Sequence, residues 1–135
     1  MTTQETHSGS CLCGGVRFTV TGPLGKVIYC HCSQCRKQTG HFYAGTNVPD
    51  AALLLEGGGN VAWYASSEAA KRGFCRICGS TLFWKAHDVG YISVLAGSLD
   101  LPTGLQAARH DFVADKGDYY SIDDGLPQND TFPQR

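Results

Sequence analysis

Seven cysteines, gathered in three short groups, are the residues of this sequence best suited to chemistry. The groups are Cys11-Leu12-Cys13, Cys30-His31-Cys32-Ser33-Gln34-Cys35 and Cys75-Arg76-Ile77-Cys78. Because the number is odd and every cysteine has a close neighbour, disulfides explain the pattern poorly, and metal ligands or redox groups explain it better. Gly14-Gly15 and Gly79 follow the first and third groups, where a chain turns so that its amides face metal-bound sulfur. The pattern predicts zinc sites.

The seven thiolates divide naturally as four plus three. Structural zinc takes four N or S ligands, whereas catalytic zinc typically keeps three protein ligands and an open position. We expect one closed structural site and one open catalytic site. The closed site takes Cys11, Cys13, Cys75 and Cys78, and the open site takes Cys30, Cys32 and Cys35.

Two other interpretations stay open at this point. The two Cys-x-x-Cys units, Cys32 with Cys35 and Cys75 with Cys78, match the ligands of a ribbon-like zinc site, which leaves the remaining three cysteines behind. Alternatively, Cys32 and Cys35 form a redox pair. That motif normally opens a helix within a βαβ pattern, which this sequence lacks.

Length and charge limit what the chain can be. Its 135 residues fit a single domain, 1–135, for which we expect a core over about 8–120 and a polar tail over 121–135. With 11 Lys plus Arg against 12 Asp plus Glu, the formal net charge of −1 gives no positive field for nucleic acid or an anionic membrane. No apolar run approaches the roughly 18 residues of a membrane span, and residues 1–10 lack a secretory apolar region. We therefore expect a cytoplasmic protein that binds neither nucleic acid nor membrane.

The elements that must position these cysteines are mostly short strands. Frequent Gly and Pro break the chain, and Val16, Phe18 and Val20 alternate with polar residues as in a half-buried strand. Further strands are expected over 26–30, 42–48, 53–56, 61–65, 73–75, 81–84, 91–96 and 107–113. Helical propensity is confined to 66–71 and to the segment after Cys32. The run 57–59 predicts a hairpin loop and no phosphate site, because no Lys-Ser/Thr follows it.

The cysteine groups and their neighbours resemble the glutathione-dependent formaldehyde-activating enzyme family, which includes centromere protein V. The likeness is carried by GSCLCGGVRF at 9–18, CHCSQCRK at 30–37 and FCRICGS at 74–80, and it covers roughly 8–120. It implies a mainly β, compact multi-sheet β-tent fold, with structural zinc at the first and third groups and catalytic zinc at the middle group. The resemblance thus selects the four-plus-three division. Tyr119-Tyr120 stands where many relatives carry Trp, a departure that affects the pocket wall.

The resemblance also implies a reaction. Three thiolates and Zn²⁺ carry a local charge of −1, and such a site binds a soft sulfur donor well. We expect a carbon–sulfur lyase, like S-(hydroxymethyl)glutathione synthase, that joins a small thiol such as glutathione to a small aldehyde such as formaldehyde, reversibly. Two zinc ions per chain are the expected cofactors. The alternative function is a non-catalytic, zinc-stapled module that binds a protein or a small thiol.

A few charged and histidine residues are secondary candidates. Glutathione has two carboxylates, for which Arg36, Lys37, Arg72 and Arg76 are possible clamps. His31 lies between two ligands and is expected to point away from the metal. His41 follows Gly40 and is expected to be a structural, hydrogen-bonded residue rather than a proton acceptor.

Overall fold

Short strands dominate the computed structural model, which describes residues 5–133. The elements are β1 (Thr6–Ser10), β2 (Arg17–Thr21), β3 (Val27–Cys30), α1 (Ser33–Thr39), β4 (Tyr43–Pro49), η1 (Asp50–Ala52), β5 (Leu53–Glu56), η2 (Gly58–Asn60), β6 (Val61–Ala65), β7 (Ala70–Cys75), β8 (Thr81–Ala86), β9 (Tyr91–Leu95), η3 (Ala96–Ser98), β10 (Ala107–Asp111) and η4 (Val113–Asp115). The expected mainly β, multi-sheet fold is confirmed. Among the described residues, no helix has the length and apolar character that crossing a membrane requires.

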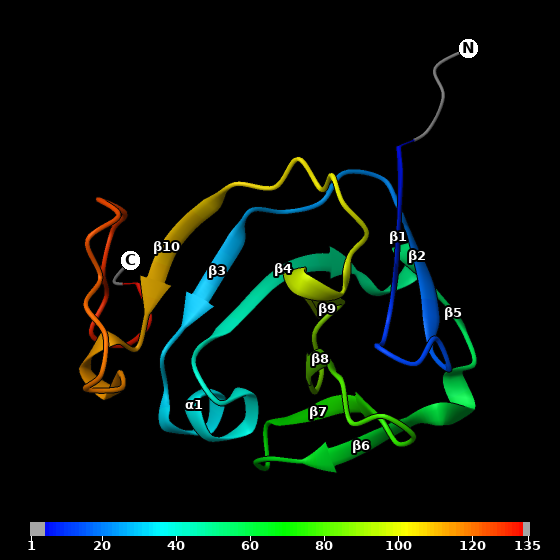
Figure 1. Cartoon of the computed structure of the whole chain (residues 1–135), viewed down its shortest axis with the longest axis horizontal. Helices are drawn as coiled ribbons and strands as arrows, with labels where there is room; N and C mark the ends of the chain where they lie inside the picture. Colours follow the sequence, from blue (N-terminus) through cyan, green and yellow to red (C-terminus); the bar gives the residue numbers. More distant parts are fainter. Residues whose placement is uncertain (1–4, 134–135) are drawn as a thin grey trace.

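The strands form two sheets. A seven-stranded sheet has the order β10-β3-β4-β9-β8-β7-β6, in which β10 and β3 are parallel and the other described pairs are antiparallel. A three-stranded antiparallel sheet has the order β1-β2-β5. In Figure 1 this smaller sheet stands on one side, and β10 and β3 stand on the other, with β6 and β7 running below.

The hydrophobic core lies between the two sheets. Phe18 and Val20 of β2 are buried, as their alternation in the sequence predicts. Phe18 packs edge-on against Phe83 of β8, with ring centroids 5.6 Å apart, and so links the small sheet to the large one. Cys11 and Cys75 belong to the same buried cluster. The first cysteine group is therefore continuous with the core.

The nine strands expected from the sequence coincide with β2 to β10 within a few residues, whereas β1 had no clear pattern. The helix expected over 66–71 is wrong. Residues 66–69 form the turn between β6 and β7, where the Ser67 hydroxyl accepts hydrogen bonds from the amides of Ala69 (3.2 Å) and Ala70 (3.1 Å), and residues 70–71 begin β7. Serine competes with helix formation in this way. The loop over 57–59 is also not a hairpin, because β5 pairs with β2 and β6 pairs with β7, so this loop crosses between the sheets.

The segment after η4 returns along β10 (Figure 1, orange to red). The His110 amide donates to the carbonyl of Pro127 at 2.9 Å, the Asn129 amide donates to the carbonyl of His110 at 2.8 Å, and the Phe112 amide donates to the carbonyl of Thr131 at 3.0 Å. This polar segment is therefore held by main-chain hydrogen bonds to the end of the large sheet. The expected boundaries at 1 and 135 lie outside the described residues.

The close approach of β1 to η3 gives a test of the packing. A Cβ atom on Gly9 would lie 2.5 Å from the carbonyl oxygen of Ser98 and would also strike the Phe18 ring. We expect Gly9→Ala to lower the free energy of unfolding by about 1–3 kcal/mol, because backbone has to move. Denaturant unfolding measures this. Gly97→Ala is the control, since nothing lies within 4 Å of its Cβ position; equal midpoints for the two variants would contradict the packing.

Candidate metal centres

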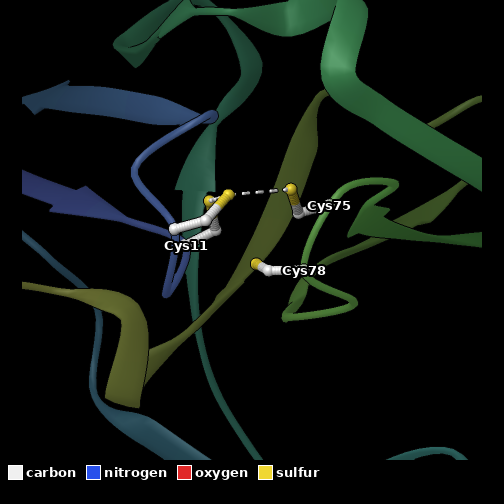
Figure 2. A group of neighbouring side chains, drawn as sticks. Cys11, Cys75 and Cys78 are labelled. Atoms are coloured by element: carbon white, nitrogen blue, oxygen red, sulfur yellow. Dashed lines mark hydrogen bonds between the residues drawn. The ribbon is translucent and has the colours of Figure 1, made fainter.

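The first and third cysteine groups meet where the two sheets meet. Cys11 and Cys13 lie in the loop between β1 and β2, and Cys75 and Cys78 lie at the end of β7 and in the turn before β8. Figure 2 shows Cys11 facing Cys75 and Cys78 from the opposite chain segment. Their four sulfur atoms all lie within 4.8 Å of one another. Residues 62 positions apart, such as Cys13 and Cys75, thus share one point in space.

The spacing of these sulfur atoms fits a tetrahedral ion. Cys11 Sγ and Cys13 Sγ are 3.6 Å apart, and Cys13 Sγ and Cys75 Sγ are 3.8 Å apart. Four sulfurs bound tetrahedrally at the Zn–S length of about 2.3 Å stand about 3.8 Å from one another. These two distances match those of a zinc-bound set, so the four donors fit zinc.

Hydrogen bonds from the two loops stabilise negative charge on these sulfurs. The amide-to-sulfur contacts are Val16 to Cys11 (3.3 Å), Gly15 to Cys13 (3.4 Å) and Ile77 to Cys75 (3.4 Å). The Ser80 hydroxyl lies 3.2 Å from Cys78 Sγ, and its hydrogen bond lowers the pKa of Cys78 to about 5. Gly14 and Gly79 have φ angles of 78° and 80°, so the left-handed turns predicted after the two groups are present.

The middle group forms a second, separate cluster of sulfur atoms. Cys30 ends β3, Cys32 is the N-cap of α1, and Cys35 lies in the first turn of that helix. The three sulfurs lie within 4.8 Å of one another, and the Cys35 amide donates to Cys32 Sγ at 3.3 Å. In the described residues, Cys32 and Cys35 are not grouped with Cys75 and Cys78, as a ribbon-like site requires. Nor is this a βαβ unit, because β3 and β4 are antiparallel.

The three thiols of this cluster do not ionise equally. Cys30 and Cys35 donate hydrogen bonds to Cys32 and lower its pKa to about 2, whereas the same interaction raises the pKa of Cys30. Without a counter-charge, one sulfur carries the negative charge and the others keep their protons. A divalent cation is what allows three adjacent thiols to ionise together, so this donor set also fits zinc.

Arg72 supplies positive charge to this cluster. It is on β7, its side chain is 3 % exposed, and its Nη2 donates to Cys35 Sγ at 3.4 Å. Its Nε and Nη1 atoms are buried and have no hydrogen-bond partner among the described residues. A buried guanidinium requires a negative partner, and the cysteine cluster is the one in contact with it. The interpretation of Arg72 as a carboxylate clamp at the pocket rim is therefore replaced by a role beside the sulfurs.

A cavity of about 730 Å³ opens beside the second cluster. All three of its cysteines line this cavity, together with Arg72 and with residues of β3, β4, β8, β9 and β10. This size falls within the range of small-molecule sites. Arg36, Lys37 and Arg76, the other clamps suggested by the sequence, are not among the lining residues.

Histidine 31 points away from the sulfurs, as expected, and joins a hydrogen-bonded chain in which the two histidines are buried. Asp124 accepts from His110 Nε2 at 2.7 Å, His31 Nε2 donates to His110 Nδ1 at 2.8 Å, and the Tyr120 hydroxyl donates to His31 Nδ1. Burial lowers the pKa of His31 to about 4, so the ring is neutral. This chain ties the loop between Cys30 and Cys32 to the C-terminal segment.

Sequence reasoning missed His110, Tyr120 and Asp124 as parts of this chain. They have no motif, and their contacts span up to 89 positions, so only the fold brings them together. His41 lies 3.0 Å from the Tyr119 hydroxyl, a hydrogen-bonded position outside the cavity lining. The expectation that Tyr119 and Tyr120 affect the pocket wall is therefore wrong, because neither lines the cavity and their hydroxyls bond to His41 and His31 instead.

The model of the glutathione-dependent formaldehyde-activating enzyme family matches residues 6–115. The chain belongs to this family. The match includes all seven cysteines and ends at the last residue of η4. The description of the family is the activation of formaldehyde in dependence on glutathione.

Two individual proteins are similar to the chain. An uncharacterized lyase of Schizosaccharomyces pombe is 32% identical over 78 residues, which are 58% of this chain and 56% of that protein, so the match spans about half of the relative. A crystal structure of a Rhodobacter sphaeroides protein has 21% sequence identity and a TM-score of 0.59, and the similarity covers 90% of this chain and 98% of the other. The second likeness supports the fold alone.

The two clusters predict different responses to cysteine removal. Native mass spectrometry of the intact chain is expected to find two zinc ions. Cys32→Ala should lose one ion and stay folded, whereas Cys78→Ala should unfold the chain, because structural zinc contributes about 10–16 kcal/mol against a net stability of roughly 5–15 kcal/mol. Equal tolerance of the two substitutions, by circular dichroism, would show that the roles are wrongly assigned.

The position of Arg72 predicts that its substitution changes the metal affinity of the second cluster and not that of the first. We expect Arg72→Met to weaken Co²⁺ binding at the second cluster by about tenfold or more, because it removes the buried counter-charge that contacts the sulfurs. Thiolate-to-cobalt charge-transfer absorption measures both clusters in one titration. Arg76→Met, an exposed residue of the third cysteine group, is the control that removes the same charge. Unchanged Co²⁺ affinity in Arg72→Met would contradict the charge-balancing role.

Proposed function

We propose that the chain is a zinc-dependent carbon–sulfur lyase that interconverts a thiol and an aldehyde with their S-hydroxymethyl adduct. The observation that supports this most is the second cysteine cluster, where three sulfur donors, one fewer than a tetrahedral set, line a cavity of about 730 Å³. The family match supports glutathione as the thiol and formaldehyde as the aldehyde.

The proposal assigns a different role to each cluster. Cys11, Cys13, Cys75 and Cys78 hold a structural zinc that joins the two sheets at the edge of the core, and Cys30, Cys32 and Cys35 hold the catalytic zinc. Zinc at the second cluster supplies a fourth position for a substrate sulfur and lowers the pKa of that thiol, so that it is a thiolate at neutral pH. Both clusters require reduced cysteines, and all seven are free thiols in the structure. This supports the cytoplasm as the compartment and a single domain as the working unit.

The reaction itself is an addition to a carbonyl group. The thiolate sulfur donates an electron pair to the aldehyde carbon and forms the carbon–sulfur bond. The carbon–oxygen π pair moves to oxygen, and the proton released by the thiol ends on that oxygen. In the reverse direction the carbon–sulfur bond breaks and the carbonyl reforms, so the atoms balance without an oxidant or a reductant.

The residues of the chain contribute charge and position. Arg72 offsets the negative charge that three cysteine sulfurs and a substrate thiolate gather at one place. The neutral His31, fixed between Tyr120 and His110, holds the backbone between Cys30 and Cys32 in one conformation. The cavity then brings thiol and aldehyde together, which makes the addition effectively unimolecular.

Exchange spectroscopy tests this function directly. The zinc-loaded chain should accelerate the exchange of formaldehyde with glutathione, measured by two-dimensional NMR exchange at equilibrium, above the uncatalysed rate. Cys32→Ala should abolish the acceleration, and Lys37→Ala, an exposed residue of α1 outside the cavity lining, should retain it. A zinc-loaded chain that binds glutathione with no acceleration would instead fit the non-catalytic binding module.

A further inference from the structure

Aromatic side chains make up much of the wall of the cavity. They are Tyr43, Trp84, Tyr91, Phe112 and Phe132. Phe112 and Phe132 form an edge-to-face pair, with ring centroids 4.7 Å apart and planes at 81°. Phe132 is nevertheless 67% exposed. A large apolar ring that stays exposed in a cavity wall offers surface that a bound apolar group would remove from water.

The backbone of Phe112 is held in an unfavourable conformation. Its φ of 58° and ψ of 39° lie in the left-handed region, where a bulky side chain other than Asn or Asp is an outlier. Such a conformation has a free-energy cost, persists only where surrounding contacts impose it, and is found preferentially at functional sites. Here the imposing contacts are main-chain hydrogen bonds, from Phe112 to Thr131 (3.0 Å) and from Val113 to Asn129 (3.0 Å).

The C-terminal segment that makes these contacts is itself fastened at two side chains. Asp124 accepts from His110 at 2.7 Å, and the Asn129 side-chain amide donates to Asp111 at 3.1 Å. The segment therefore places Phe132 against Phe112 in a defined way. Phe132 lies 17 positions beyond residue 115, where the match to the family model ends. One ring of the pair, that of Phe132, therefore lies outside the part of the chain that the family model matches.

The positively charged side chains that line the cavity already bond to other residues of the chain. Arg109 Nε donates to both carboxylate oxygens of Asp111, at 3.0 and 3.2 Å, and Arg72 is directed at Cys35. Among the described lining residues these are the cations, and each already faces an acidic or sulfur partner. The carboxylates of glutathione are therefore poorly matched to this wall. Because the rest of glutathione is polar, an apolar group in this place has to come from the aldehyde.

We propose that Phe112 and Phe132 form an apolar subsite for a bulky group on the reacting carbon of the adduct. The inference rests on the proposed function and names its substrate class: adducts of a thiol with aromatic or similarly large apolar aldehydes. Formaldehyde, which carries only hydrogen on that carbon, leaves the subsite unfilled.

Two unreactive thioethers test the subsite by binding alone. S-benzylglutathione places a ring on the carbon next to sulfur, and S-methylglutathione places only hydrogen there. Titration calorimetry with the zinc-loaded chain should find S-benzylglutathione bound at least about tenfold more tightly, which is typical of added apolar surface in a fitting pocket.

Substitutions of Phe112 and Phe132 test whether these two rings produce the preference for S-benzylglutathione. Phe132→Ala and Phe112→Gly should each reduce the ratio of the two thioether affinities to about threefold or less. Glycine at 112 also suits the left-handed backbone, so the Phe112→Gly variant should fold. Leu54→Ala is the matched control, because Leu54 is 69% exposed on the small sheet and does not line the cavity. It should keep the full preference.

Equal binding of the two thioethers, no binding of either, or a preference that survives both phenylalanine substitutions would overturn the subsite. The exchange of formaldehyde with glutathione separates this failure from failure of the proposed function. Accelerated exchange without a benzyl preference leaves the lyase and removes the subsite. A benzyl preference that depends on Phe132, without accelerated exchange, leaves the subsite and removes the lyase.

Discussion

Negative charge on closely spaced sulfur is the constraint on which the rest of this structure depends. Seven thiols gather in two clusters whose sulfurs lie within 4.8 Å of one another, a spacing at which several thiolates repel strongly unless a cation lies between them. The protein provides part of the compensation itself, through amides and Ser80 at the first cluster and through Arg72 at the second. A divalent ion bound at each cluster would supply the compensation that these groups do not.

The two clusters use this charge differently because their surroundings differ. The first joins loops of two sheets, and Cys11 and Cys75 continue into the buried core, so its loss exposes apolar surface as well as sulfur. The second is confined to the end of β3, the N-cap of α1 and the first turn of that helix, and its cysteines join no two sheets. A closed donor set at the joint and a three-donor set at a cavity are what structural and reactive roles respectively need.

Local patterns in the sequence were enough to predict the strands and the grouping of cysteines along the chain. Phe18 and Val20 alternate because one face of β2 is buried, and Gly14 and Gly79 mark turns that only left-handed backbone can make. The helix over 66–71 was wrong because Ser67 instead caps a tight turn, an effect of one side chain that propensity does not resolve. The roles of Asp124, His110 and Phe132 depend on the return of the C-terminal segment along β10, a non-local pairing without a sequence signal.

Strand β7 connects the two clusters physically. Arg72 and Cys75 are an odd number of residues apart on one strand, so their side chains leave opposite faces of the large sheet. The irregularity in the pairing of β7 with β8 puts its extra residue, Leu82, on β8, which leaves the alternation on β7 intact. Arg72 therefore faces the cavity, while Cys75 faces the joint between the sheets. One strand thus carries a cysteine of the first cluster and the counter-charge of the second, although the two clusters share no ligand.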